Sequence, residues 1–227
     1  MSSWISRKAT TCTRKFPNEV THTTIHLLPT FHILISTAGR PALRRMLDSL
    51  RNELTKNDAI TIVFDGENAL QQSGFCEDWI RGHLSTIHVV EQQPNLGFWG
   101  HGVRNKYQSM LETRTTFVMN ADDDDEYIPG SFQKLRLLCK HDHTLYIAKF
   151  IVKKPRSDVI VPSQFNSITK NNIGTPCGII PFNIAGQSSW ELCYGGDFSY
   201  YEHLQTKVQD IQFLNVIIYR VVHESHA

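Results

Sequence analysis

The sequence lacks the features that mark a membrane-spanning, secreted or nucleic-acid-binding protein. No apolar run approaches the roughly 20 residues that a spanning helix needs, and the nearest, residues 213–222, is interrupted by Asn215 and Arg220. Residues 1–16 carry positive charge, but no apolar segment follows them, so they do not form a secretory signal. The net charge is only +1 and the basic residues are dispersed, which argues against nucleic acids and anionic membranes as partners.

Paired cysteines and glycosylation sequons are missing as well. The five cysteines are odd in number, widely spaced and without a CxxC pair, so we expect reduced thiols and no zinc site. No Asn-x-Ser/Thr sequon occurs. These absences are typical of a reducing compartment and predict a cytoplasmic protein, or one held at a membrane through a partner.

Motifs of three common enzyme classes are also absent. There is no GxxxxGK[ST] phosphate loop and no GxGxxG fingerprint, which excludes the usual kinase-like and dinucleotide-binding classes. No GxSxG nucleophile elbow occurs either. Any catalytic chemistry therefore has to come from other residues.

The composition is that of an ordinary globular protein. The chain has 227 residues, 41% hydrophobic and 20% charged, which is enough for one large domain with a substantial core. Residues 1–28 are polar and show no periodicity. We therefore assign 1–28 to an N-terminal extension and 29–227 to the domain.

Strands and helices alternate after Pro29. Strands are predicted at residues 31–36, 59–64, 86–90, 115–119, 145–152, 159–161 and 212–222, and helices at 42–54, 77–83, 101–112, 131–140 and 198–208. Short connections between alternating strands and helices are typical of parallel strands joined by crossover helices. The prediction is a single Rossmann-like α/β domain with a mainly parallel central sheet flanked by helices and a more irregular second half.

Four consecutive aspartates, Asp122–Asp125, follow the apolar strand predicted at 115–119. Open α/β sheets bind ligands outside the carboxyl ends of their strands, where this charge is concentrated. Like charges about 5 Å apart repel by roughly 3 kcal/mol at an effective dielectric of 20, so the cluster needs solvent, protonation or a cation. In an extended chain Asp122 and Asp124 point to one face and Asp123 to the other.

Two carboxylates on one face are suitable ligands for Mg²⁺ or Mn²⁺, which keep some waters and accept substrate phosphates. The alternative is a solvated acidic turn, or a cap for the helix that begins near Pro129. The motifs at the other predicted strand ends favour the metal–phosphate site.

Six motifs follow one another along residues 31–224: ISTAGRP, IVFDG, NLGFWGHGVRN, MNADDDDEYIP, YGGDFSYYEHL and YRVVH. Their order resembles that of the GT-A nucleotide-sugar glycosyltransferases, especially family two, with its Asp-Gly, N-x-G…RN, D-x-D-D, acidic and R-x-H motifs. The segment GTPCGIIPF and the small size are also similar to glycosyltransferase domains of large DNA viruses, which would place the protein in the host cytoplasm.

The resemblance implies a GT-A-like domain that transfers a sugar from a nucleotide-sugar donor, UDP-linked in the first instance, to a glycan, glycoprotein or other hydroxyl acceptor. It implies Mn²⁺ or Mg²⁺ as cofactor. Asp122 and Asp124 match the DxD pair: Asp124 binds the metal, directly or through water, and Asp122 contacts ribose or metal. Asp123 belongs to the same nucleotide-binding segment.

Further nucleotide contacts are implied at the other loops. Asp65 is expected to accept a hydrogen bond from the uracil or other base edge. The remaining residues assigned to the nucleotide-sugar site are Thr37, Ala38, Gly39, Arg40, Asn95, Gly97 and Arg104. In the alternative, Asp65, Asn95 and Gly97 only shape turns, and Arg104 lies on a helix surface.

Asp197 is the candidate catalytic base. It follows two glycines, whose freedom allows a backbone to approach a sugar closely, and it precedes a predicted helix. A carboxylate there can take the proton of an acceptor hydroxyl, although Asp is also a favoured N-cap and both roles can coexist. His223 is the candidate third metal ligand or diphosphate contact, but RVVH is one residue longer than R-x-H, and a plain strand-end histidine is the alternative. Aromatic residues that either stack on a sugar or fill the core are Trp99, Trp190 and Tyr194.

The resemblance favours inversion with Asp197 as base, whereas a retaining enzyme needs no such base. Two other functions stay open. A sugar-phosphate nucleotidyltransferase shares the fold type and acidic metal site, but its first loop is normally rich in glycine and lysine, where this chain offers only Arg40. A catalytically silent nucleotide-sugar or glycan-binding module is the other, and the intact acidic run argues against it.

Overall fold

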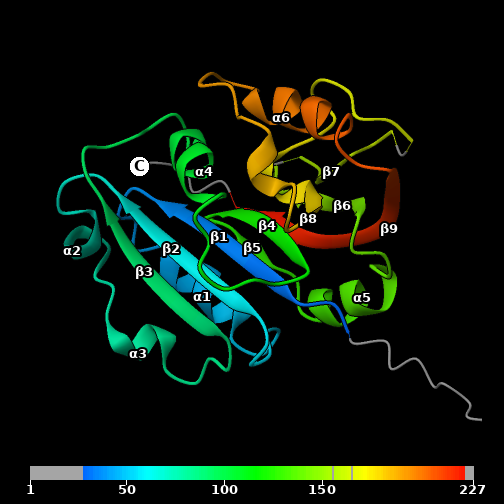
Figure 1. The fold of residues 1–227 in the computed structure, drawn as a ribbon. Helices are drawn as coiled ribbons and strands as arrows, with labels where there is room; N and C mark the ends of the chain where they lie inside the picture. The colour runs from blue at the N-terminus through cyan, green and yellow to red at the C-terminus, as the bar shows by residue number, and fades with distance from the viewer. Residues whose placement is uncertain (1–27, 155, 165, 223–227) are drawn as a thin grey trace, which may run out of the picture.

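The computed structural model describes residues 28–154, 156–164 and 166–222, so the predicted N-terminal extension lies outside it except for Leu28. The described chain is a single α/β domain built on one sheet, with the strand order β3-β2-β1-β4-β8-β6-β9-β5 and with β7 paired to β6. Figure 1 shows helices on both sides of this sheet. The predicted fold class is confirmed.

The elements of the first half alternate as predicted. The strands are β1 (Phe31–Thr37), β2 (Ala59–Asp65), β3 (Thr86–Gln92) and β4 (Phe117–Asp122). The helices between them are α1 (Leu43–Leu50), α2 (Ala69–Ser73), α3 (Glu77–Ile80) and α4 (His101–Tyr107).

The second half supplies the rest of the sheet. Its strands are β5 (Glu126–Tyr127), β6 (Thr144–Val152), β7 (Val159–Val161), β8 (Gly178–Pro181) and β9 (Asp210–Val221). Its helices are α5 (Ser131–Leu138) and α6 (Gly196–Leu204), with 3₁₀ turns at Thr175–Cys177 and Ala185–Gln187.

Strands β1 and β2 are buried along their whole length, because helices cover both faces of the sheet there. The apolar side of α1 (Leu43, Met46, Leu47 and Leu50) belongs to the main core with Ile33, Ile35, Ile60 and Ile62. Leu34 and Val63 point the other way and meet Val103 and Tyr107 of α4. Alternate side chains of each strand thus pack against helices on opposite faces of the sheet.

The strands β3, β2, β1 and β4 are joined by long parallel ladders. From β1 the chain goes to β2 on one side, and later to β4 on the other, which makes the β1–β4 boundary a switch point. Open α/β sheets bind ligands in the crevice at such a point, beyond the carboxyl ends of the strands. The first, second and fourth strands therefore bring their following loops to one rim.

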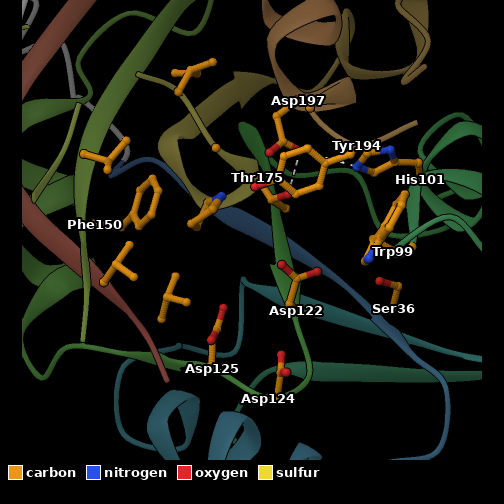
Figure 2. Close-up of a pocket in the computed structure, with 18 of the residues that line it drawn as sticks. Ser36, Trp99, His101, Asp122, Asp124, Asp125, Phe150, Thr175, Tyr194 and Asp197 are labelled. Atoms are coloured by element: carbon orange, nitrogen blue, oxygen red, sulfur yellow. Dashed lines mark hydrogen bonds and ion pairs between the residues drawn. The ribbon is translucent and has the colours of Figure 1, made fainter. Parts of the chain in front are cut away.

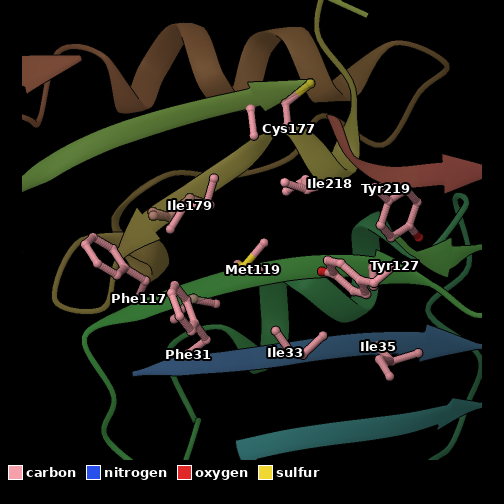
Figure 3. Close-up of a cluster of buried hydrophobic side chains, with 14 of the residues drawn as sticks. Phe31, Ile33, Ile35, Phe117, Met119, Tyr127, Cys177, Ile179, Ile218 and Tyr219 are labelled. Atoms are coloured by element: carbon pink, nitrogen blue, oxygen red, sulfur yellow. The ribbon is translucent and has the colours of Figure 1, made fainter. Parts of the chain in front are cut away.

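The other part of the sheet is mixed. The β6–β9 ladder is parallel, whereas β4–β8, β6–β8, β6–β7 and β5–β9 are antiparallel. Figure 3 shows how side chains from β1, β4, β8 and β9 fill one core, with Met119 between Ile33 and Ile179. This packing joins the irregular half to the parallel half through one shared core.

Several element boundaries differ from the sequence-based expectation. Strand β4 runs through Asn120 and Ala121 to Asp122 instead of ending at residue 119, so the first aspartate belongs to the strand. Strand β8 lies between residues 161 and 212, where the sequence predicted no strand. It has only four residues and pairs with strands distant in sequence. Helix α2 was not expected either, because its five residues carry no helical period.

The described residues include four of the five cysteines. Cys76, Cys139, Cys177 and Cys193 are free thiols, two of them buried, and Cys12 lies outside the described residues. Among the helices of the described segments, none is both long and apolar enough to cross a bilayer.

Asp58 joins the starts of β1 and β2 to α5. Its carboxylate is fully buried and accepts hydrogen bonds from the amide of Phe31 (2.8 Å) and the amide of Thr55 (2.7 Å). It also forms an ion pair with Arg136. Removing one partner of a buried pair leaves the other charge uncompensated.

We expect Asp58→Ala to lower the free energy of unfolding by about 3–5 kcal/mol, measured by urea denaturation. Asp142→Ala is the control, since that side chain is 80% exposed. A loss within about 1 kcal/mol of the control would mean that Asp58 does not hold these elements together.

Candidate active site

A cavity of about 620 Å³ opens at the rim where β1, β2 and β4 end. The loops after these strands line one part of it, and the start of α6 lines another. Figure 2 shows Asp122, Asp124 and Asp125 on its lower side, Asp197 and Thr175 on its upper side, and Phe150 opposite Trp99. Acidic, aromatic and aliphatic side chains thus share one space.

Most residues predicted for the site meet in this cavity. Its lining includes Thr37, Ala38, Arg40, Asp65, Asn95, Gly97, Asp122, Asp124 and Asp197. Gly39, Arg104 and Asp123 are placed behind the lining, and His223 lies outside the described residues. The structure therefore brings strand-end residues from distant parts of the chain to one place, while their binding roles stay predictions.

The four aspartates do not form an extended segment. Strand β4 ends at Asp122, a turn occupies Asp123 and Asp124, and Asp125 precedes β5. Asp122 and Asp124 still line the cavity, while Asp123 is fully buried and accepts a hydrogen bond from the Thr37 hydroxyl. The predicted facing is observed, but a turn produces it and strand alternation does not.

Arginines neutralise three of the aspartates. Arg40 forms ion pairs with both Asp123 and Asp124, and the Asp124 carbonyl accepts a hydrogen bond from Arg45. Arg104 forms an ion pair with Asp122. The cluster's expected need for positive charge is thus met in part by guanidinium groups of the protein.

Arg104 is buried and contacts residues that line the cavity. Its side chain is 1% exposed, lies 5.1 Å from the centre of the Trp190 ring, and donates to the carbonyl of Trp99 at 2.9 Å. Because Arg104 also pairs with Asp122, it fixes the orientation of that carboxylate. The structure thus gives Arg104 a supporting position, and excludes the helix-surface alternative.

Within the described residues, Asp125 is the one of the four aspartates that forms no ion pair with an arginine. Burial raises its pKa to about 8. The negative charge of Asp122 raises it further, while the amide of Val222, which donates at 2.9 Å, opposes the shift. Burial also raises the pKa values of Asp123 and Asp124, against the opposing effect of Arg40. Asp125 is therefore protonated at neutral pH.

The raised pKa of Asp125 predicts a pH-dependent stability. Because the folded protein holds this proton up to about pH 8, and an unfolded aspartate releases it near pH 4, the contribution is complete below pH 4. It is lost as the pH rises from 4 to 8. In the presence of EDTA, the melting temperature of Asp125→Asn should fall less than that of wild type across this window. Parallel curves for the two proteins would contradict the assignment.

Asp65 anchors the loop that follows β3. Its two carboxylate oxygens accept the amides of Leu96 (2.7 Å) and Gly97 (2.9 Å), and its carbonyl accepts the Asn95 side-chain amide (2.9 Å). A carboxylate has about four lone-pair sites, so this leaves capacity for a ligand. Asp65 thus shapes a turn, as in the alternative above, and its contact with a nucleobase stays a prediction.

The loop held by Asp65 has an unusual backbone. Gly97, Phe98, Trp99 and Gly100 all have positive φ, at 65°, 56°, 52° and 80°. For non-glycine residues this conformation costs about 1–3 kcal/mol each and persists only where the surroundings enforce it. The Asp65 anchor and the Arg104 bond to the Trp99 carbonyl enforce it here.

Asp197 lies in the first turn of α6, but Gly195 is the N-cap, so the capping alternative is wrong. The Asp197 carboxylate accepts a hydrogen bond from the Thr175 hydroxyl at 3.0 Å. His101 Nε2 lies 3.4 Å from the same oxygen. Asp197 is therefore held on two sides while its side chain stays 26% exposed to the cavity.

His101 is a site residue that the sequence did not reveal. Its Nδ1 lies 2.8 Å from the carbonyl oxygen of Glu191. A carbonyl only accepts, so Nδ1 carries a proton, and Nε2 is the nitrogen directed at Asp197. An added Cβ at Gly196 would lie 2.8 Å from the His101 ring, so this glycine allows the pairing. Nothing local in the sequence connects residues so far apart.

Metal ligation has limited support from the side chains alone. Within the described residues, no group of three or more His, Cys, Asp or Glu side chains is placed to hold a metal ion. Asp122 and Asp124 each form their ion pair through one oxygen and are 32% and 29% exposed. The atoms available as metal ligands are carboxylate oxygens, the type of ligand that Mg²⁺ and Mn²⁺ prefer.

No protein-family model matches this sequence, and no curated protein matches it. Solved structures do match. TarS 1–349 from S. aureus superposes with a TM-score of 0.66 at 18% identity, over 85% of this chain and 60% of that one. The mannosyltransferase PcManGT from Pyrobaculum calidifontis, in complex with GDP-Man and Mn²⁺, gives 0.62 at 13% identity, over 88% of this chain and 59% of that one.

A third solved structure also matches. The 4-diphosphocytidyl-2C-methyl-D-erythritol synthase from Anaerococcus prevotii DSM 20548 gives a TM-score of 0.50 at 13% identity, over 82% of this chain and 89% of that one. This chain spans about three fifths of the length of TarS 1–349 and PcManGT. At such identities the matches establish the fold, which is the GT-A fold that the motif order predicted.

Proposed function

We propose that this protein transfers a sugar from a nucleotide-sugar donor to a hydroxyl acceptor, with the help of a divalent metal ion. The observation that carries the proposal is the placement of Asp122, Asp124 and Asp197 in one cavity at the switch point of the sheet. Such a crevice is where open α/β sheets bind nucleotides. The similarity to PcManGT in complex with GDP-Man and Mn²⁺ supports the same assignment.

The donor's diphosphate belongs at the acidic rim, with the first loop around it. Thr37, Ala38 and Arg40 line the cavity there, together with Asp65 and Asn95. Arg40 brings the positive charge that a diphosphate needs. We propose UDP as the nucleotide and a hexose as the sugar on the motif resemblance, and a cytoplasmic location on the sequence pattern.

Asp122 and Asp124 are the residues that would hold a divalent ion. Since such ions are often bound by one or two carboxylates plus substrate phosphates and waters, a third protein ligand is not required. When bound, the ion neutralises the leaving diphosphate and acts as a Lewis acid. Arg104 keeps Asp122 oriented, and Arg40, which pairs with Asp124, lies beside the same position.

Asp197 is proposed as the base of an inverting reaction. The acceptor oxygen forms a bond to the anomeric carbon, the bond from that carbon to the diphosphate breaks, and the hydroxyl proton passes to Asp197. The nucleoside diphosphate leaves with the electron pair of the broken bond. Thr175 and His101 act as positioning residues, since both lie against the carboxylate from the wall of the cavity.

The product distinguishes this function from the two alternatives. We would incubate the protein and Mn²⁺ with UDP-, GDP- and dTDP-sugars, and separately with nucleoside triphosphates and sugar phosphates. Release of a nucleoside diphosphate from at least one donor supports the transferase. Pyrophosphate release from the second mixture identifies a nucleotidyltransferase, the function suggested by the weaker match to the diphosphocytidyl-erythritol synthase. Binding without either product indicates a silent module.

Nucleotide affinity should depend on the metal through Asp124. We expect calorimetry with UDP to show tighter binding in Mn²⁺ than in EDTA, and Asp124→Asn to remove most of that difference. The control is Asp48→Asn, a half-exposed aspartate on α1. Asp123→Asn should lower the melting temperature, because Asp123 is buried against Thr37 and Arg40. It should reduce the effect of Mn²⁺ on UDP affinity less than Asp124→Asn does. Equal UDP affinity with and without Mn²⁺ in wild type would end the metal role.

Asp197→Asn should lower sugar transfer by roughly 10²–10⁴-fold. Donor affinity and melting temperature should stay near wild type, because Gly195 caps the helix and asparagine keeps the shape of the side chain. Glu202→Gln is the matched control, an exposed carboxylate on the same helix outside the cavity. Turnover of Asp197→Asn near that of the control would eliminate Asp197 as base and favour a retaining mechanism.

A further inference from the structure

We propose that Trp99 and Tyr194 form a binding platform for a pyranose ring of the acceptor, so that the acceptor is a carbohydrate. The inference rests on the proposed transferase function, and it narrows the acceptor from any hydroxyl compound to a sugar. Trp99 lies in the loop between β3 and α4, and Tyr194 precedes α6. The two residues come from distant parts of the sequence and meet at one side of the cavity (Figure 2).

The platform consists of exposed aromatic surface on the lining of the cavity. Trp99 is 66% exposed and Tyr194 is 88% exposed, although both line the cavity. Their ring centres are 6.1 Å apart with an angle of 76°, so the two rings form a corner. By contrast Trp190, the other tryptophan considered for stacking, is 2% exposed and packs on Tyr200. Trp190 therefore belongs to the core, and of the three aromatic residues considered for stacking, Trp99 and Tyr194 remain for a ligand.

The backbone under Trp99 is built to present the ring. Residues 97–100 run through four left-handed conformations in succession, and Trp99 and Phe98 adopt them without the freedom of glycine. Asp65 fixes the amide of Gly97, and Arg104 fixes the carbonyl of Trp99. A conformation that is unfavourable by itself and held by buried charges points to a function.

The neighbours of the corner select its occupant. The Trp99 ring centre is 6.5 Å from the His101 ring, and His101 Nε2 is 3.4 Å from Asp197. A ligand on the corner thus lies next to a carboxylate that accepts hydrogen bonds. A pyranose has a face of C–H groups that suits the negative face of an aromatic ring. It also has hydroxyls around its edge, one of which can reach Asp197.

The donor's nucleobase is the other group in the reaction that could stack on the rings of Trp99 and Tyr194. Asp124 and Asp125 of the acidic rim, where the diphosphate is proposed to bind, lie on a different side of the cavity from Asp197 (Figure 2). Asp65 and Asn95 also line the cavity. The corner beside Asp197 is therefore assigned to the acceptor, and stacking of the base becomes an outcome of the test.

The test uses Trp99→Ala and Tyr194→Ala in the full chain, with Trp99→Phe as a conservative variant. Phe98→Ala is the matched control, because Phe98 has the same left-handed backbone and is 49% exposed, but does not line the cavity. The probes are methyl β-glucoside, methyl β-galactoside and methyl N-acetyl-β-glucosaminide. Their binding is measured by saturation-transfer NMR, and UDP binding by calorimetry with Mn²⁺. Donor hydrolysis is followed without any acceptor.

We expect wild type to bind at least one glycoside, and the two alanine variants to weaken that binding by on the order of tenfold each. Trp99→Phe should keep most of the affinity, and Phe98→Ala all of it. UDP affinity and donor hydrolysis should change by less than about twofold in every variant, because the corner does not contact the donor. Trp99→Ala and Tyr194→Ala should therefore transfer sugar to the acceptor more slowly while they hydrolyse the donor at the wild-type rate.

Three results would overturn the platform. Glycoside binding unchanged in both alanine variants would place the acceptor elsewhere, and no glycoside binding by wild type would exclude a carbohydrate acceptor of this kind. Loss of UDP affinity in Trp99→Ala would assign the corner to the base. Failure of the proposed function gives a different pattern, since wild type then releases no nucleoside diphosphate from any donor whether or not glycosides bind to the corner.

Discussion

Four adjacent carboxylates at a strand end have to be compensated within a few ångströms, and much of the site depends on how this is done. Arg104 pairs with Asp122, and Arg40 pairs with Asp123 and Asp124. Asp125 keeps its proton, since burial raises its pKa to about 8. These pairs connect the first loop, β4 and α4, so the charge balance also fixes the position of the loops. The result is a rim on which Asp122 and Asp124 stay partly exposed and the Arg40 guanidinium lies beside Asp124, an arrangement that suits the proposed metal–diphosphate group.

The same contacts organise the opposite wall of the cavity. Arg104 reaches from Asp122 to the Trp99 carbonyl, so the acidic rim and the strained aromatic loop share one support. His101 begins the helix that carries Arg104, and it faces Asp197 on α6. The proposed donor rim, base and acceptor platform are therefore coupled through α4. A change in this helix is expected to disturb all three, whereas changes at Phe98 or Glu202 leave them in place.

Much of the fold could be predicted from the sequence, because the spacing of apolar residues along a strand or helix is a local pattern. The apolar faces of β1, β2 and α1 follow directly from residue spacing, and the order of strand-end motifs predicted which residues would meet. The partners of those residues were not predictable. Arg40 with Asp124, Asp65 with the amide of Gly97, and His101 with Asp197 are contacts between segments far apart in the chain. Strand β8 escaped for the same reason, since its four residues are defined by pairing with β4 and β6.

The central claim is that the acidic rim binds a nucleoside diphosphate together with a divalent ion. A crystal structure with UDP and Mn²⁺, with data collected at an energy where manganese scatters anomalously, tests it most directly. The account predicts an anomalous peak within coordination distance of a carboxylate oxygen of Asp122 or Asp124, and of a diphosphate oxygen. A diphosphate bound at the rim without a manganese peak, with the Arg40–Asp124 pair intact, would contradict the metal role. UDP bound outside this cavity would contradict the whole assignment.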